Sequence, residues 1–251
     1  MVVLFVAGLV QTRAAFALDA FEIQVYDGTA NPAGVPGLEL HINDVVRGST
    51  TVQAPELPPN HQAHFTLEPS YGVRPFWELG AYIQTTLLPD GTFDFAGAKV
   101  RSKVVTPPSW STTTRLGLNV EVSDVPRRYE AEQWGLELRP IAARDLGRFS
   151  VAVNPIVGIP LTGGAPTFEP AIQALFVFSR LGSLGLEYYA DLGAITGFSR
   201  VQDQAHYLFE VANLLSVRNL ELNLGVGEGF TPASNPFVVK LIVGYQLGGA
   251  H

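Results

Sequence analysis

Apolar residues recur at every second position along almost the whole chain, and this period constrains the fold more than any other feature. In segment 77–84 the odd positions are Trp, Leu, Ala and Ile, whereas the even positions are Glu, Gly, Tyr and Gln. Segments 115–122 and 220–227 show the same split. Successive side chains of a β-strand point to opposite faces, so this period indicates strands and not helices. Turn sequences such as Pro89-Asp90-Gly91 separate the runs, which predicts antiparallel strands joined in chain order.

The alternating runs predict twelve strands. They cover residues 36–44, 61–72, 75–88, 92–104, 112–122, 129–141, 147–159, 168–179, 184–192, 206–216, 219–228 and 237–247. Along the chain, short links between strands alternate with longer ones. Bacterial outer-membrane barrels show the same alternation, with short periplasmic turns and long outer loops. Such barrels have an even number of strands, so twelve would close with both ends on the periplasmic side. The further alternating run Phe21–Tyr26 is then a periplasmic or lumen-lying segment; the alternative counts it as one of fourteen strands.

Composition indicates that the apolar face of the sheet contacts lipid and not a protein core. The chain of 251 residues is 47% hydrophobic and only 16% charged, yet it has no apolar run of helix-spanning length beyond its first residues. The predicted apolar faces carry almost no charge, and the chain contains only three lysines, which favours lipid contact over a soluble sandwich. Aromatic residues near strand ends fit interface girdles; they are Phe65, Tyr71, Phe76, Trp77, Trp134, Phe149, Phe176, Phe178, Tyr207, Phe209 and Tyr245. Phe93 and Phe95 share the parity of Lys99 and Arg101, which requires a bulge or a lumen-facing aromatic pair.

The amino terminus predicts secretion. Val2–Val10 has the length of a signal-peptide apolar core, and Ala15-Phe16-Ala17 supplies the small residues of a cleavage site. No basic residue precedes the apolar core, and the alternative is an apolar amino-terminal strand or helix. We therefore expect residues 1–17 to be a cleaved signal and residues 18–251 to form one barrel domain. The absence of cysteine excludes disulfides and thiolate chemistry, and the net charge of −7 argues against nucleic acid as a partner.

The last predicted strand, Phe237–Leu247, is similar to the closing strand of outer-membrane barrels, which carries their assembly signal. Lys240, Tyr245 and Leu247 match that signal, whereas Ile242 stands where glycine is usual. This similarity implies the barrel-assembly machinery and outer-membrane lipid as partners, and a location in the outer membrane of a Gram-negative cell after export.

More broadly, the chain resembles the outer-membrane barrels of the "MetA-pathway of phenol degradation" family. The resemblance rests on Phe21–Asp27, on Gly37–His41, and on the rhythm of hairpins that continues to Tyr245. It implies an outer-membrane channel and says little about the solute.

Charged residues gather on the face predicted to line the lumen. The candidate selectivity residues are Glu39, His41, Glu68, Glu78, Lys99, Arg101, Arg115, Glu121, Glu137, Arg139, Glu187, Glu210, Glu221 and Lys240, and Lys103 and Asp191 share their parity. Carboxylates outnumber cations in this set, which predicts a narrow conduit for small neutral or cationic solutes. The alternative is a network of paired charges that fills and stiffens the barrel.

An outer-membrane lipid hydrolase is the main alternative function, and an inert structural barrel is another. His41 and His64 share the polar parity of neighbouring strands with Asn43 and Ser70, so a Ser/His/Asn set can be drawn. No sequence motif marks a nucleophilic serine, and polar linings produce such sets by chance. We therefore expect a small solute as partner, no enzymatic activity, no cofactor and no metal. Asp90-Gly91 is a hairpin turn in this interpretation, since the segment lacks the further acidic ligands of a calcium loop.

Overall fold

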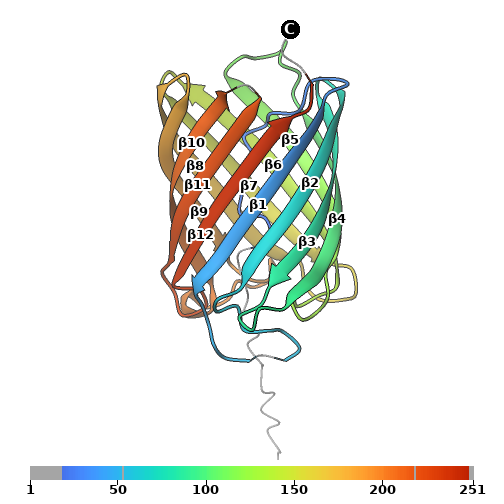
Figure 1. Ribbon diagram of the computed structural model, residues 1–251, viewed down its shortest axis with the longest axis vertical. Helices are drawn as coiled ribbons and strands as arrows, with labels where there is room; N and C mark the ends of the chain where they lie inside the picture. Colours follow the sequence, from blue (N-terminus) through green and yellow to red (C-terminus); the bar gives the residue numbers. More distant parts are fainter. Residues whose placement is uncertain (1–18, 53, 218, 249–251) are drawn as a thin grey trace, which may run out of the picture.

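A computed structural model describes residues 19–52, 54–217 and 219–248, and the predicted signal Met1–Ala17 lies outside this part of the chain. Within it, twelve antiparallel strands form a closed barrel in which each strand pairs with its neighbours in sequence and β1 closes on β12 (Figure 1). The strands are β1 (Pro36–Arg47), β2 (Ala63–Arg74), β3 (Trp77–Leu87), β4 (Phe93–Val105), β5 (Thr114–Asp124), β6 (Trp134–Leu146), β7 (Phe149–Pro160), β8 (Thr167–Ser179), β9 (Gly182–Asp191), β10 (Ala205–Val217), β11 (Leu220–Gly229) and β12 (Phe237–Gln246). The predicted up-and-down barrel of twelve strands is confirmed. No helix in the described residues is long and apolar enough to cross a membrane.

The two ends of the barrel differ in their connections. β1 begins and β12 finishes at the upper end in Figure 1, where β2–β3, β6–β7 and β8–β9 are joined by two-residue turns. Longer connections, such as residues 48–62 and 192–204, lie at the opposite end. We refer to these as the short-turn end and the long-loop end. The predicted parity of link lengths is therefore correct, although the β4–β5 link at the short-turn end spans residues 106–113.

Apolar side chains cover the outer wall, as the alternation predicts. On β3, Leu79 and Ile83 are 42% and 50% exposed, whereas Tyr82 and Gln84 on the other face are almost fully buried. The rings of Phe149 and Phe176 contact each other at a tilt on the outside of β7 and β8, with centroids 5.3 Å apart. Tyr207 and Phe209 were predicted for the outer girdle, and this assignment is wrong, because both are buried inside the barrel at 1% and 0% exposure.

A bulge resolves the parity conflict on β4. The register between β3 and β4 shifts between Gln84 and Thr85, and Gly97 adopts a φ of 136°, which favours glycine. The extra residue turns Phe93 and Phe95 outward, with exposures of 63% and 56%, while Lys99 and Arg101 stay inside. The bulge anticipated from the sequence is thus present, and the lumen-facing alternative for the two phenylalanines is wrong.

The largest boundary error concerns β6, predicted at residues 129–141 and found at Trp134–Leu146. Residues 142–146, predicted as a link, continue the strand because Asp145 forms an ion pair with Arg115 of β5 at 2.6 Å. The turn is instead Gly147-Arg148, where Gly147 has a φ of 69°. Charged residues near a strand end therefore belong to the strand here and not to the turn.

Residues 19–35 form no strand and pass through the inside of the barrel, reaching β1 at the short-turn end. We call them the lumen segment. Phe21–Tyr26 lies within it, so the lumen-lying interpretation is confirmed and the fourteen-strand alternative is wrong.

Candidate functional site

Side chains of the barrel wall hold the backbone of the lumen segment. Asn154 of β7 clamps Tyr26 with two hydrogen bonds: the Tyr26 N–H donates to Asn154 Oδ1 at 2.7 Å, and Asn154 Nδ2 donates to the Tyr26 carbonyl at 3.0 Å. Lys240 Nζ of β12 donates to the Ile23 carbonyl at 2.9 Å, and Arg115 Nε of β5 donates to the Asp27 carbonyl at 2.7 Å. The segment is therefore tied to strands around the barrel. Such contacts satisfy polar backbone that would otherwise be buried without partners.

A buried apolar cluster lies in the part of the lumen toward the long-loop end. Ile23 of the lumen segment belongs to a buried cluster with Tyr207, Phe209 and Val238 of the wall. The Phe21 ring lies nearby, edge-on to His64 with centroids 4.6 Å apart. We call Phe21, Ile23, Tyr207, Phe209 and Val238 the packed layer. It resembles the core of a soluble protein more than a water-filled pore.

A cavity of about 210 Å³ lies on the other side of the packed layer, toward the short-turn end. Its charged lining consists of Asp27, Glu39, Glu68, Arg101, Lys103, Glu187 and Glu221, together with polar residues such as Gln24, Asn213 and Asn223. Glu221 and Gly244 face each other across β11 and β12, and both line this space. The lumen therefore holds an apolar cluster toward the long-loop end and a polar cavity toward the short-turn end.

Ion pairs connect most of the predicted lumen residues. Arg101 Nη2 lies 2.5 Å from Glu68 and 2.6 Å from Glu78, and Lys103 lies 3.0 Å from the same Glu78 carboxylate. Further pairs join Lys240 with Glu187, Lys99 with Asp19, Arg115 with Asp145, and Arg139 with both Glu137 and Glu22. Glu121 is buried and accepts hydrogen bonds from Asn119 at 2.6 Å and from Tyr82 at 3.3 Å. The predicted charges thus form a network that the lumen segment helps to complete.

One predicted lumen residue, Glu210, points to the outside. Its neighbours in β10, Phe209 and Val211, are buried inside the barrel, so Glu210 shares the exposed face with Leu186 of β9 and Val226 of β11. The prediction was wrong because the alternation in β10 places apolar side chains inside. The assignment assumed that polar residues face the lumen and apolar residues face lipid, and β10 has the opposite arrangement at this point.

Glu130 lies beside the packed layer in the link between β5 and β6. Burial raises the pKa of the Glu130 carboxyl to about 7, against the opposing effect of the Lys99 ammonium. The Asp19 carboxylate, which pairs with Lys99, raises the pKa of Glu130 further. This carboxyl therefore titrates near neutrality at the long-loop end of the lumen.

The Ser/His/Asn set suggested by the sequence is not assembled. His41 and His64 are buried in the lumen, away from lipid, and Ser70 Oγ accepts a hydrogen bond from Asn31 of the lumen segment at 2.8 Å. His64 Nδ1 lies 3.3 Å from the Thr86 hydroxyl. On the outer wall, the His206 ring contacts Tyr188 at 2.6 Å and Gln204 at 3.0 Å. These histidine contacts involve no serine, so the arrangement does not support a serine hydrolase.

Sequence reasoning missed the apolar packed layer and the wall residues that bind the lumen segment, such as Asn154 and Tyr82. The alternation in β10, where Tyr207 and Phe209 share one face and His206 and Glu210 the other, could have indicated the packed layer. Among the described residues, one group of histidine and carboxylates is placed to hold a metal ion, namely Glu39, His41 and Glu68. All three were predicted for the lumen lining, and His41 also for the Ser/His/Asn set.

The fold is similar to that of solved outer-membrane channels. The COG4313 outer membrane channel from Pseudomonas putida F1 aligns with 90% of this chain and 100% of its own, with a TM-score of 0.63 and 13% identity. The KdgM porin aligns with 84% of this chain and 99% of its own (TM-score 0.60, 8% identity), and the NanC porin with 84% and 100% (TM-score 0.55, 8% identity). No protein-family model and no curated protein matches the chain. The likeness therefore supports an outer-membrane barrel fold in general, without selecting the aromatic-degradation family.

Proposed function

We propose that this chain is an outer-membrane channel for small neutral or cationic solutes, exported through its amino-terminal signal and assembled through its closing strand. The apolar outer wall supports an outer-membrane location, because lipid contact demands such a surface. The structural neighbours named as a channel and as porins fit this role, as does the resemblance of Phe21–Asp27 and Gly37–His41 to the aromatic-degradation barrels.

The polar cavity inside a closed barrel is the observation that carries the proposal. In its lining, Arg101 and Glu68 neutralise each other, and Glu187 is paired with Lys240. The carboxylates of Glu221, Glu39 and Asp27 also line the cavity. Carboxylates around a narrow aqueous space attract cations and repel anions, which supports a preference for cationic over anionic solutes.

The test is ion selectivity in a planar bilayer. Mature protein in a potassium chloride gradient should give a small conductance with a reversal potential on the cation-preferring side. Glu221→Gln removes one cavity carboxylate and should reduce that preference, because fewer negative charges then act on a passing ion. Glu228→Gln is the matched control, since Glu228 lies on the same strand with its side chain on the outer face.

Anion preference, or selectivity that is equal in the parent and Glu221→Gln, would contradict the proposal. A barrel that stays silent even after residues 20–31 are removed would favour the structural alternative without transport. The ring contacts of His64 and His206 involve no serine, so lipid hydrolysis is expected to be absent from the same preparation.

A further inference from the structure

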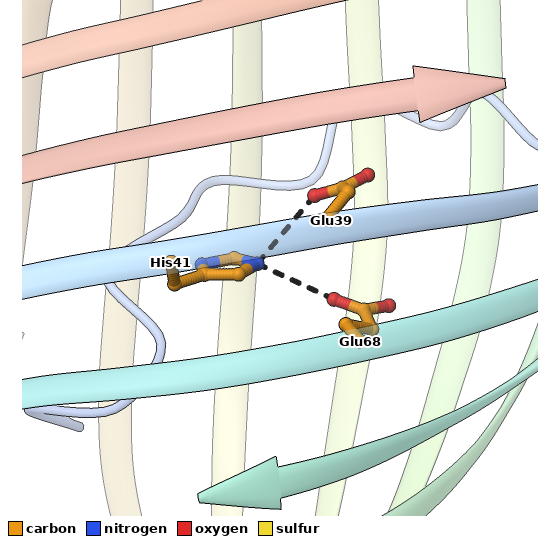
Figure 2. A group of neighbouring side chains, drawn as sticks. All are labelled: Glu39, His41 and Glu68. Carbon is orange, nitrogen blue, oxygen red and sulfur yellow. Dashed lines mark ion pairs between the residues drawn. The ribbon is translucent and has the colours of Figure 1, made fainter. Parts of the chain in front are cut away.

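Glu39, His41 and Glu68 converge at one point of the lumen wall (Figure 2). Glu39 and His41 are two residues apart on β1 and share its inner face, and Glu68 stands directly opposite Glu39 on β2. His41 Nε2 lies 3.5 Å from Glu39 Oε2 and 3.4 Å from Glu68 Oε2. These ligand atoms all lie within 4.8 Å of one another, so a single ion can contact the three side chains.

Three buried polar atoms of this group lack a hydrogen-bond partner. His41 is 0% and Glu68 2% exposed, and neither ring nitrogen of His41 nor Glu68 Oε2 has a hydrogen-bond partner. A charge-assisted hydrogen bond between nitrogen and carboxylate is about 2.7–2.9 Å long, and the Arg101 pairs in the same lumen are as short as 2.5 and 2.6 Å. The His41 distances are longer than that, although buried polar groups normally find partners.

The separations match those of ligands around a shared ion. Zinc binds histidine nitrogen at about 2.0–2.1 Å and carboxylate oxygen at about 2.0–2.2 Å, and tetrahedral angles then place ligand atoms roughly 3.3–3.5 Å apart. The two measured separations, 3.4 and 3.5 Å, fall in this range. The geometry around His41 is therefore that of a metal-ligand set more than that of a hydrogen-bonded ion pair.

Arg101 orients the carboxylate of Glu68 for this role. Arg101 Nε donates to Glu68 Oε1 at 2.7 Å, which leaves Oε2 directed at His41. Arg101 is itself held by Glu78 at 2.6 Å, and Lys103 pairs with that same carboxylate. Outer contacts that fix the orientation of a ligand are typical of metal sites. Glu39 and Glu68 would each offer one carboxylate oxygen to such an ion.

We propose that Glu39, His41 and Glu68 bind one divalent first-row transition-metal ion, with Zn²⁺ as the preferred probe. A histidine nitrogen favours zinc over calcium or magnesium, which prefer ligand sets made of oxygen alone. Glu39 and Glu68 line the cavity, so water in that space would complete the coordination. The Gln24 amide of the lumen segment lies 3.4 Å from Glu39 Oε2, which places the site where segment and wall meet.

The experiment is a Zn²⁺ titration of the untagged, full-length mature barrel in detergent, measured by calorimetry or against a chromophoric chelator. We expect one ion per barrel. His41→Gln and Glu68→Gln should each weaken binding by about 100-fold or more, since even changes in outer contacts cost about 10–100-fold. His64→Gln is the matched control, because His64 is also buried in the lumen but lies outside the group of three.

Folding is checked for each variant by the shift in gel mobility between boiled and unboiled samples. Absence of stoichiometric Zn²⁺ binding by the parent, or equal binding by the folded His41→Gln barrel, would overturn the proposal. If Glu68→Gln fails to fold, Glu39→Gln replaces it, since Glu39 is partly exposed to the cavity and makes no pair with Arg101. The titration needs no transport, so its result is independent of whether the barrel is a channel.

Discussion

The two halves of the lumen are built on different principles. The packed layer toward the long-loop end contains Ile23 and Phe209 at 0% exposure, whereas the half toward the short-turn end contains a cavity lined by charges and amides. The same barrel wall surrounds both. The difference arises because β10 turns apolar side chains inward, and the lumen segment places its own apolar residues against them. In the proposed channel, the packed layer would be the barrier to passage and the cavity the selective surface.

Deleting part of the lumen segment should have the largest effect on the difference between the two halves of the lumen. Deletion of residues 20–31 retains the predicted signal and its cleavage position but removes Ile23 and Phe21 from the packed layer. We expect single-channel conductance to rise several-fold, because the space that these residues occupy becomes available to water and ions. The barrel should also lose stability, since buried Arg139 loses Glu22 as an ion-pair partner.

Deletion of residues 162–164, which are exposed in the link between β7 and β8, is the matched control and should leave conductance unchanged. Equal conductance in the parent and the 20–31 deletion would show that the lumen segment is not the barrier. Planar-bilayer recordings of all three proteins decide between these outcomes.

Substitutions in the packed layer should cost more stability than substitutions in the cavity. Phe209 packs edge-on against Tyr189 with centroids 5.6 Å apart, and it faces Gly227, where a side chain would collide with its ring. Phe209→Ala should lower the free energy of unfolding by about 3–5 kcal/mol, as in the core of a soluble protein. Glu221→Gln in the cavity should change it by less than about 0.5 kcal/mol.

Leu186→Ala is the control for loss of apolar volume, because Leu186 is 46% exposed on the outer wall and lipid can fill the space that it leaves. Denaturant unfolding from lipid vesicles measures all three variants. Similar costs for Phe209→Ala and Leu186→Ala would mean that the packed layer is no more tightly packed than the lipid-facing surface.

The sequence predicted the wall of the barrel better than its interior. A period of two depends only on local geometry, so the number and order of the strands could be predicted from the residues, and the bulge near Phe93 was one of two predicted alternatives. The interior depends on contacts between distant parts of the chain, such as Asn154 with Tyr26, which no local pattern encodes. The rule of a polar lumen failed at Glu210 for the same reason, because its neighbours pack against residues of the amino terminus.

The convergence of Glu39, His41 and Glu68 was also beyond the sequence. Glu39 and His41 share a face by their spacing, but only the register of β1 against β2 places Glu68 opposite Glu39. A shift of two residues would keep the same faces and move Glu68 away from both. The parity of the lumen residues could thus be predicted, whereas their partners could not.

The smallest expected effect concerns the charge at the edge of the packed layer. Glu130 has a pKa raised from 4.5 to about 7, mainly by burial, so its protonated form is favoured in the folded barrel. Its contribution to stability is fully present below pH 4.5 and is lost as the pH rises through about 7. Because Glu130 is only half-buried, we expect a loss of about 1 kcal/mol between roughly pH 5 and pH 8.

Glu130→Gln should remove this loss, and Glu132→Gln in the same link should keep it, as measured by denaturant unfolding across that pH range. An unchanged pH profile in Glu130→Gln would show that this carboxyl is already ionised at the edge of the packed layer, and that water reaches farther into the long-loop half than the burial of Phe21 implies.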